Sequence, residues 1–247
     1  MNKYIIASMV AILSVASILV IGGATSVVAE EADDKMMKDD SMMKDDSMMK
    51  DDSMMMMHDY TFADITDSVV ITDSSEFENI QLSVGAYVPT DGSGGAFGYG
   101  VITGKGLEAI IVTTTHAGVL DSEAQKDAND ASFHNHYVAL ENLEDDDKCP
   151  ELQVRDISFD EPGDVHVSDK SIVIEDAPYD FRAVHSLSGE HIKFSADDRP
   201  ANAVSFTINP VDANGNTSVT DIQAVCINDV KSVDIRVVVP ASYWEGN

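Results

Sequence analysis

Short runs of β-branched residues alternate with polar breaks along most of the second half of the chain. The breaks contain Gly, Pro, Asn and Asp, and the clearest runs are AIIVTTT, DISF, SIVIED, AVSFTI, IQAVCI and VDIRVVV. β-Branched residues favour strands, and the residues in the breaks favour the turns that join strands. No stretch has the spacing of an amphipathic helix. The pattern predicts roughly ten or eleven strands between Phe77 and Val239, and one all-β domain over residues 60–247, built as a sandwich or jelly roll.

Two polar stretches inside this region predict turns. HSLSGEHIKF is expected to form a hairpin around Ser188 and Gly189, with His185 and His191 at the surface on either side. TDGSGGAFGYG is rich in glycine but lacks the Lys-Ser/Thr pair and the following helix of a phosphate-binding loop. It is therefore interpreted as a turn followed by the start of a strand.

The first 29 residues have the layout of a secretory signal peptide. Lys3 precedes an apolar run from Tyr4 to Gly23, and Val27 and Ala29 occupy the small-residue positions of a cleavage site before Glu30. The apolar run is also close to the roughly 20 residues that span a bilayer, so an uncleaved anchor is the alternative. Both readings place the remainder of the chain outside the cytoplasm, secreted or associated with the cell envelope.

Charge and cysteine content agree with export. The formal net charge is −29, which disfavours binding to nucleic acid or to an anionic membrane surface and favours attraction of cations. The chain has two cysteines, Cys149 and Cys226, and an even pair in an exported protein predicts one disulfide. A disulfide-bonded pair offers no thiolate to a metal.

Residues 30–59 contain a charged methionine repeat. The chain has 12 Met, and all except Met1 and Met9 lie here, in a Met-Met-Lys-Asp-Asp-Ser unit that starts at Met36, Met42 and Met48. Six residues advance about 240° around an α-helix, so the Met pairs would form no apolar stripe. We expect a disordered segment. It resembles the Met-x-Lys-Asp short-repeat segments of other small exported proteins.

The repeat has two interpretations. Thioether sulfur is a soft ligand that suits Cu(I), so the tract could collect copper; the alternative is a flexible spacer. The ligands of such a soft-metal tail would be Met36, Met37, Met42, Met43, Met48, Met49, Met54, Met55, Met56, Met57 and His58.

Three histidines are predicted to meet at one end of the β domain. By strand alternation His116 continues the face of Ile110, Val112 and Thr114, and His134 and His136 share the face of Val138 and Leu140. If the two strands are antiparallel neighbours, the three imidazoles converge. The long loop between them carries acidic residues, of which Asp121 and Asp127 are candidate ligands.

Such a group of histidines can form the protein side of a Zn²⁺ or Cu²⁺ site with an open position. The simpler alternative is that His134 and His136 cap an edge strand and hydrogen-bond to the loop.

A different ligand set follows from a resemblance to the cupin family. His134-x-His136 is followed by Glu141, and EPGDVHV supplies a Pro-Gly pair and His166. This order is similar to the cupin motif, which implies that His134, His136, Glu141 and His166 bind one metal inside a barrel.

Three functions are compatible with these patterns. The first is an exported acidic metal-binding protein that handles copper or zinc. The second is a cell-surface structural or adhesive module on a flexible spacer, with cell-envelope components as partners. The third is a cupin-type metalloenzyme.

Overall fold

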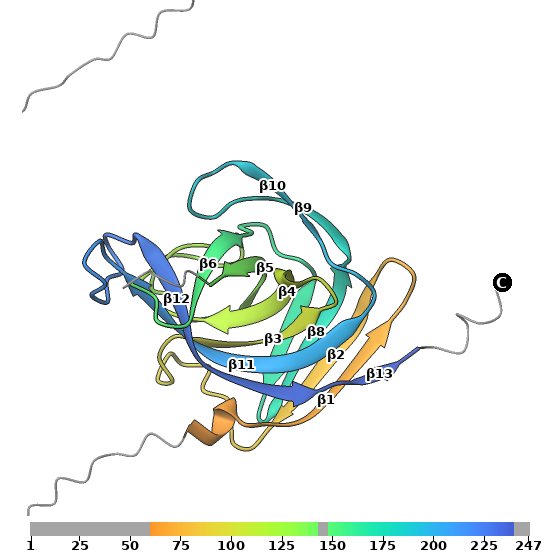
Figure 1. Cartoon of the computed structure of the whole chain (residues 1–247). Coiled ribbons are helices and arrows are strands. Elements are labelled where there is room, and N and C mark those ends of the chain that lie inside the picture. The colour runs from red at the N-terminus through yellow and green to blue at the C-terminus, as the bar shows by residue number, and fades with distance from the viewer. Residues whose placement is uncertain (1–59, 143–147, 240–247) are drawn as a thin grey trace, which may run out of the picture. The chain divides into compact units, whose positions relative to one another are not determined.

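The computed structural model describes residues 60–142 and 148–239, and its architecture is all-β, as predicted (Figure 1). Thirteen strands and the 3-10 turn η1 (Tyr60–Ala63) form the regular structure, and the described residues contain no α-helix. None of their elements is a helix long and apolar enough to cross a membrane. The predicted leader (1–29) and methionine repeat (30–59) lie outside the described residues.

Six strands close into a barrel in which every neighbouring pair is antiparallel. Their order around the barrel is β11 (Pro200–Val211), β12 (Ala224–Asp234), β6 (Leu152–Ile157), β5 (His134–Glu141), β4 (Gly106–Thr115) and β3 (Phe97–Thr103).

A five-stranded sheet lies beside the barrel (Figure 1). Its order is β13 (Arg236–Val238), β1 (Ile65–Thr72), β2 (Glu76–Val84), β8 (Ser171–Pro178) and β7 (Asp164–Ser168), with only the β1–β13 pair parallel. A separate hairpin consists of β9 (Asp180–Val184) and β10 (His191–Ser195).

The domain has two main hydrophobic cores because the strands next to the sheet are buried on both faces. One core packs the sheet residues Ile80 and Ile174 against Ile111 and Tyr137 on the outer face of the barrel. The other lines the inside of the barrel and includes Ile110, Val112, Val138, Leu140, Val154, Val204, Phe206 and Ile227. Burial on both faces explains why residues 109–112, the AIIV of AIIVTTT, are all apolar and do not alternate with polar residues.

Glycines in β3 make room inside the barrel. Gly98 and Gly100 alternate with outward-facing residues, and a Cβ at Gly98 would lie 2.7 Å from the Phe206 ring. A Cβ at Gly100 would lie 2.5 Å from the carbonyl oxygen of Ile111. The GYG sequence is therefore strand, as predicted, and glycine is needed there because neighbouring groups occupy the side-chain positions.

Two details of the strand prediction are wrong. Strand β1 precedes the predicted range, because its polar residues break the apolar run. In the β9–β10 hairpin His191 pairs with Val184, so the loop is longer than the predicted two residues.

His185 is also buried, contrary to expectation, because its Nδ1 accepts the backbone N–H groups of Leu187 and Ser188.

The predicted disulfide between Cys149 and Cys226 is present. It joins the segment before β6 to β12, and both residues are buried with Val211 and Ala224 in a small cluster. A structural disulfide indicates an oxidising, extracytoplasmic compartment.

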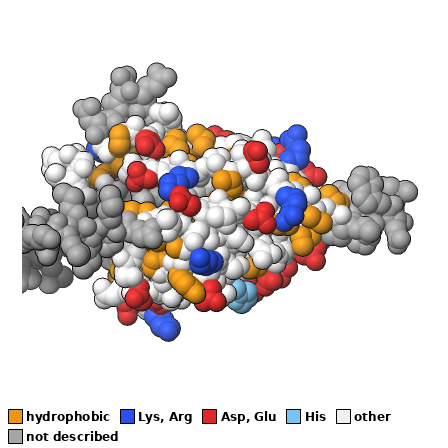
Figure 2. Space-filling model, turned by 90° about the horizontal axis from the view of Figure 1, so that it is seen from below, with side chains coloured by type: hydrophobic (Ala, Val, Ile, Leu, Met, Phe, Trp, Pro, Cys, Tyr) orange, Lys and Arg blue, Asp and Glu red, His pale blue; other side chains and the backbone are white. Residues whose placement is uncertain are grey.

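Charged side chains of both signs are interspersed over the face of the domain that Figure 2 shows. The described residues form several exposed ion pairs, including Lys231 with Asp64 at 2.6 Å and Arg236 with Asp67 at 3.1 Å. Exposed pairs of this kind contribute little to stability, so the two cores and the disulfide hold the fold together.

Candidate metal centre

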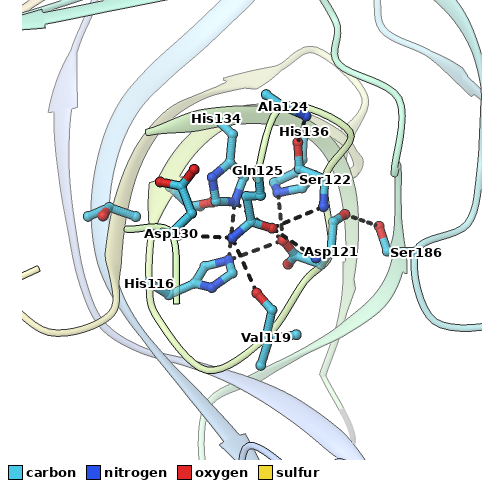
Figure 3. Close-up of polar contacts among 12 residues, drawn as sticks. His116, Val119, Asp121, Ser122, Ala124, Gln125, Asp130, His134, His136 and Ser186 are labelled. Carbon is cyan, nitrogen blue, oxygen red and sulfur yellow. Dashed lines mark hydrogen bonds and ion pairs between the residues drawn. The ribbon is translucent and has the colours of Figure 1, made fainter. Parts of the chain in front are cut away.

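The β4–β5 pairing brings the three predicted histidines together. Thr114 pairs with His134 and Val112 with His136, so both imidazoles face the inside of the barrel. His116 follows the end of β4 and turns toward the same point (Figure 3). All three side chains are buried.

A loop carboxylate completes the group. The Oδ1 atom of Asp121 lies 3.2 Å from His116 Nε2, 3.3 Å from His134 Nε2 and 3.7 Å from His136 Nε2 (Figure 3). The Nε2 atoms of His116 and His134 are 3.1 Å apart, and one donor atom from each of the four residues lies within 4.8 Å of every other.

These separations suit a tetrahedral metal ion. Metal–ligand bonds of about 2.0–2.1 Å place tetrahedral ligand atoms roughly 3.3 Å apart. The three distances among His116, His134 and Asp121 match that value within a few tenths of an ångström. His136 Nε2 lies farther out, 3.7 Å from Asp121 Oδ1, so its ring would have to move inward to complete the geometry.

Backbone carbonyls set the tautomers of two rings. His134 Nδ1 lies 2.8 Å from the carbonyl oxygen of Ser132, and His136 Nδ1 lies 2.6 Å from that of Ser158. A carbonyl only accepts, so each Nδ1 must carry the hydrogen and donate it. Each neutral ring then turns an Nε2 lone pair toward Asp121, which is the usual arrangement of a metal-ligating histidine.

The centre of the cluster has too few hydrogens for its acceptors. Two Nε2 lone pairs face a carboxylate oxygen, and His116 can supply at most one N–H in its neutral form. The Thr114 hydroxyl, 3.3 Å from His134 Nε2, can supply another hydrogen. His136 Nε2 and Asp121 Oδ1 are nevertheless buried without a hydrogen-bond partner. Buried acceptors without donors are costly, and a cation would satisfy them all.

Gln125 holds Asp121 in place, and sequence reasoning missed it. Its amide oxygen accepts the backbone N–H groups of Asp121 and Ser122, and its Nε2 donates to the carbonyls of Val119 and Asp130 (Figure 3). The buried amide thereby fixes the loop around itself. In the sequence, Gln125 is one of many polar residues in this loop, and nothing in the pattern distinguishes it from the others.

A second support comes from a distant segment. The Ser186 hydroxyl donates to the backbone carbonyl of Asp121 at 2.7 Å, which ties the loop to the turn of the β9–β10 hairpin. Ser122 also donates to Glu161 at 2.5 Å. These contacts bridge 65 and 39 positions of sequence, so no local pattern could have indicated them.

Burial also controls protonation in the cluster. Desolvation lowers the pKa of His136 to about 4, because the barrel interior disfavours the imidazolium. Burial alone would raise the pKa of Asp121, but the neighbouring His116, whose Nε2 lies 3.2 Å from Asp121 Oδ1, outweighs that effect and holds the pKa well below its usual range. His136 is therefore neutral and Asp121 ionised at neutral pH, the forms that bind a metal.

The metal-free protein should lose stability as the pH falls from about 6.5 to about 4. Unfolded His136 binds a proton near pH 6.5, whereas folded His136 binds one only near pH 4. Protons therefore favour the unfolded state throughout this window, by at most about 3 kcal/mol from this residue. Guanidinium titrations with a chelator present, at pH values across the window, would measure the change. A His136→Gln variant should show a shallower slope, and an identical slope would contradict the assignment.

An apolar cavity of about 340 Å³ adjoins the cluster inside the barrel. His116, Asp121 and His136 lie on its wall, and its other lining residues are mainly aliphatic. Leu187, Val219 and Val230 line it while being 53%, 43% and 39% exposed, so the cavity reaches the surface. Its volume falls within the range of roughly 300–1,000 Å³ typical of small-molecule sites.

Other predicted ligands are not brought to the cluster. Asp127 is exposed, and its carboxylate accepts the backbone N–H of Asn129 within its own turn. Glu141 lies at the far end of β5, where it accepts from Gln153. His166 is on β7 in the other sheet, exposed and 3.4 Å from Glu175. The alternative, cupin-like ligand set of His134, His136, Glu141 and His166 therefore does not come together at one point. The proposed ligands of the methionine tail, Met36–Met57 and His58, lie outside the described residues.

No family model matches the chain, and searches of curated proteins and solved structures give no significant match. Function is therefore inferred from the geometry of the site alone.

Proposed function

We propose that this is an exported metal-binding protein in which His116, His134, His136 and Asp121 hold one divalent transition-metal ion. The observation that supports it best is the orientation of the donors. Two rings donate their Nδ1 hydrogens to carbonyls and turn bare Nε2 atoms toward a buried carboxylate. A hydrogen-bonded cap on an edge strand, the simpler alternative, would not leave His136 Nε2 and Asp121 Oδ1 buried without a partner.

The donor set narrows the choice of metal. Three imidazole nitrogens and one carboxylate oxygen suit Zn²⁺ and Cu²⁺, whereas Mg²⁺ and Ca²⁺ prefer oxygen ligands throughout. The near-tetrahedral spacing favours Zn²⁺, because Cu²⁺ prefers a tetragonal arrangement. We therefore propose Zn²⁺ as the first candidate and Cu²⁺ as the second.

Metalloenzyme activity is a second candidate, and the adjoining cavity supports it. Zinc can expand its coordination from four to five ligands, so a molecule in the cavity could join the four protein donors, and the ion would act there as a Lewis acid. The surface-module alternative needs neither a metal nor a cavity.

Metal loading of the mature chain tests the proposal. We expect one tightly bound Zn²⁺ per chain by elemental analysis after dialysis, and an intense four-coordinate absorption spectrum when Co²⁺ replaces it. His191→Ala is the matched control, because His191 is exposed at the β9–β10 hairpin and should leave binding unchanged. His185 is a poorer control, because its neighbour Ser186 supports Asp121. Binding no tighter than that of a generic acidic protein would reject the proposal.

The same titration on a chain without residues 30–57 separates the tail from the domain. Thioether ligands prefer Cu(I) and imidazoles prefer the divalent ions. The shortened chain should keep its Zn²⁺ site, and any Cu(I) that only the longer chain binds belongs to the methionine repeat.

A further inference from the structure

The cavity and the metal cluster together favour a ligand that has an apolar part and a polar head group. The aliphatic wall of the cavity would bind the apolar part. The histidine Nε2 atoms and Asp121 Oδ1 lie together at one place on that wall, where the head group would bind. A cavity of about 340 Å³ has more than twice the roughly 150 Å³ that accommodates benzene in an apolar protein interior. It is large enough for a short alkyl chain.

The charge of the loaded centre selects the head group. Three neutral imidazoles, one carboxylate and a divalent ion leave one net positive charge inside the barrel. A buried charge in apolar surroundings is costly unless a partner neutralises it. One monoanionic donor, such as a carboxylate, would neutralise this charge.

The described residues of the cavity wall offer an anionic head group no cationic partner other than the metal. Of the described residues that line the cavity, none is Lys or Arg, and Asp121 would repel an anion before the metal binds. The buried Thr114 hydroxyl lines the cavity 3.3 Å from His134 Nε2, where it can donate a hydrogen bond to a head group on the metal. Anion binding should therefore depend on the metal.

We propose that the barrel binds a small amphiphilic carboxylate, with its head on the metal ion and its alkyl chain along the apolar cavity. This proposal rests on the proposed metal site. The exposed rim formed by Leu187, Val219 and Val230 would provide the way in.

Titration of n-alkyl carboxylates into Zn²⁺-loaded and metal-free protein tests the proposal. Each additional buried methylene should tighten binding roughly fourfold, so octanoate should bind on the order of a hundredfold more tightly than butanoate. Metal-free protein should bind neither detectably. In Co²⁺-loaded protein, octanoate should also change the absorption spectrum, because the head joins the coordination sphere.

Cavity-filling variants provide the structural control. Val138→Phe and Val154→Phe place a ring inside the barrel and should weaken octanoate binding at least tenfold while leaving Zn²⁺ affinity unchanged. Val237→Phe makes the same replacement at an exposed position on β13 and should have no effect.

The outcomes separate the two proposals. If Zn²⁺ binds but octanoate binds no more tightly than butanoate, the ligand proposal is wrong and the metal site stands. Equal octanoate binding with and without metal would also overturn it, because the head would not be on the ion. Failure to bind Zn²⁺ rejects the metal site, and the ligand proposal with it.

Discussion

Replacing His136 with alanine should lower the affinity of the protein for Zn²⁺ by a hundredfold or more. The change removes one of four donors and leaves a gap that the other three cannot close. Changes to residues that only hydrogen-bond to a ligand already cost about 10–100-fold, so loss of a ligand should cost at least as much. Competition with a chromophoric chelator at neutral pH measures the ratio, with His191→Ala as the matched control.

The Asp121→Asn variant tests the charge of the fourth ligand, because asparagine has nearly the same shape as aspartate but no negative charge. The amide should fit the loop, because the backbone contacts to Gln125 and Ser186 do not involve the side chain. It removes the negative charge that favours a cation, so Zn²⁺ affinity should also fall. Unchanged affinity in both the His136 and the Asp121 variants would show that Zn²⁺ binds elsewhere, provided that near-ultraviolet circular dichroism shows both variants folded.

Loss of the disulfide should destabilise the domain by about 4 kcal/mol. The bridge joins residues 77 positions apart and restricts the unfolded chain accordingly. For a domain of this size the midpoint of thermal unfolding should fall by roughly 8–16 °C. Guanidinium unfolding of the Cys149→Ala/Cys226→Ala double variant gives the free energy of unfolding.

Reduced wild-type protein is the control for that measurement, since it should match the double variant. A loss below about 1 kcal/mol in both would show that the bridge restrains little, because the unfolded chain is already compact in that region.

Strand periodicity predicted the larger part of the site. Side chains alternate along a strand, so the faces of β4 and β5 could be assigned from the positions of Ile110, Val112 and Val138. Antiparallel neighbours joined by one loop place the end of the first strand beside the start of the second. These two rules suffice to bring His116, His134 and His136 together, as they lie in the structure.

The fourth ligand could not be chosen by such rules. Asp121 and Asp127 occupy the same loop and are equally acidic, and only the folded loop separates them. Its shape depends on the buried amide of Gln125 and on Ser186 from another hairpin. The cupin-like set failed for a related reason, because β7, which carries His166, belongs to the other sheet.

The closed barrel was also beyond the sequence pattern. Short strands and turns indicate a sandwich and a barrel equally well, because both alternate inward and outward residues. What closes this barrel is the pairing of β11 with β3, two strands far apart in the chain. The glycines of β3 hint at crowding, but only the packed structure shows that Phe206 is the group that needs the space.

All four proposed ligands come from one short piece of chain, between His116 and His136. Closing a loop of that size has a small entropic cost, whereas the disulfide and the β3–β11 pairing must join distant segments. The order of folding outside the cytoplasm follows from this difference. The β4–β5 hairpin should form early, and a metal ion captured by it would lock the strand register before the barrel closes. If the proposed site takes up its ion at that stage, metal acquisition would be a step in the maturation of the protein.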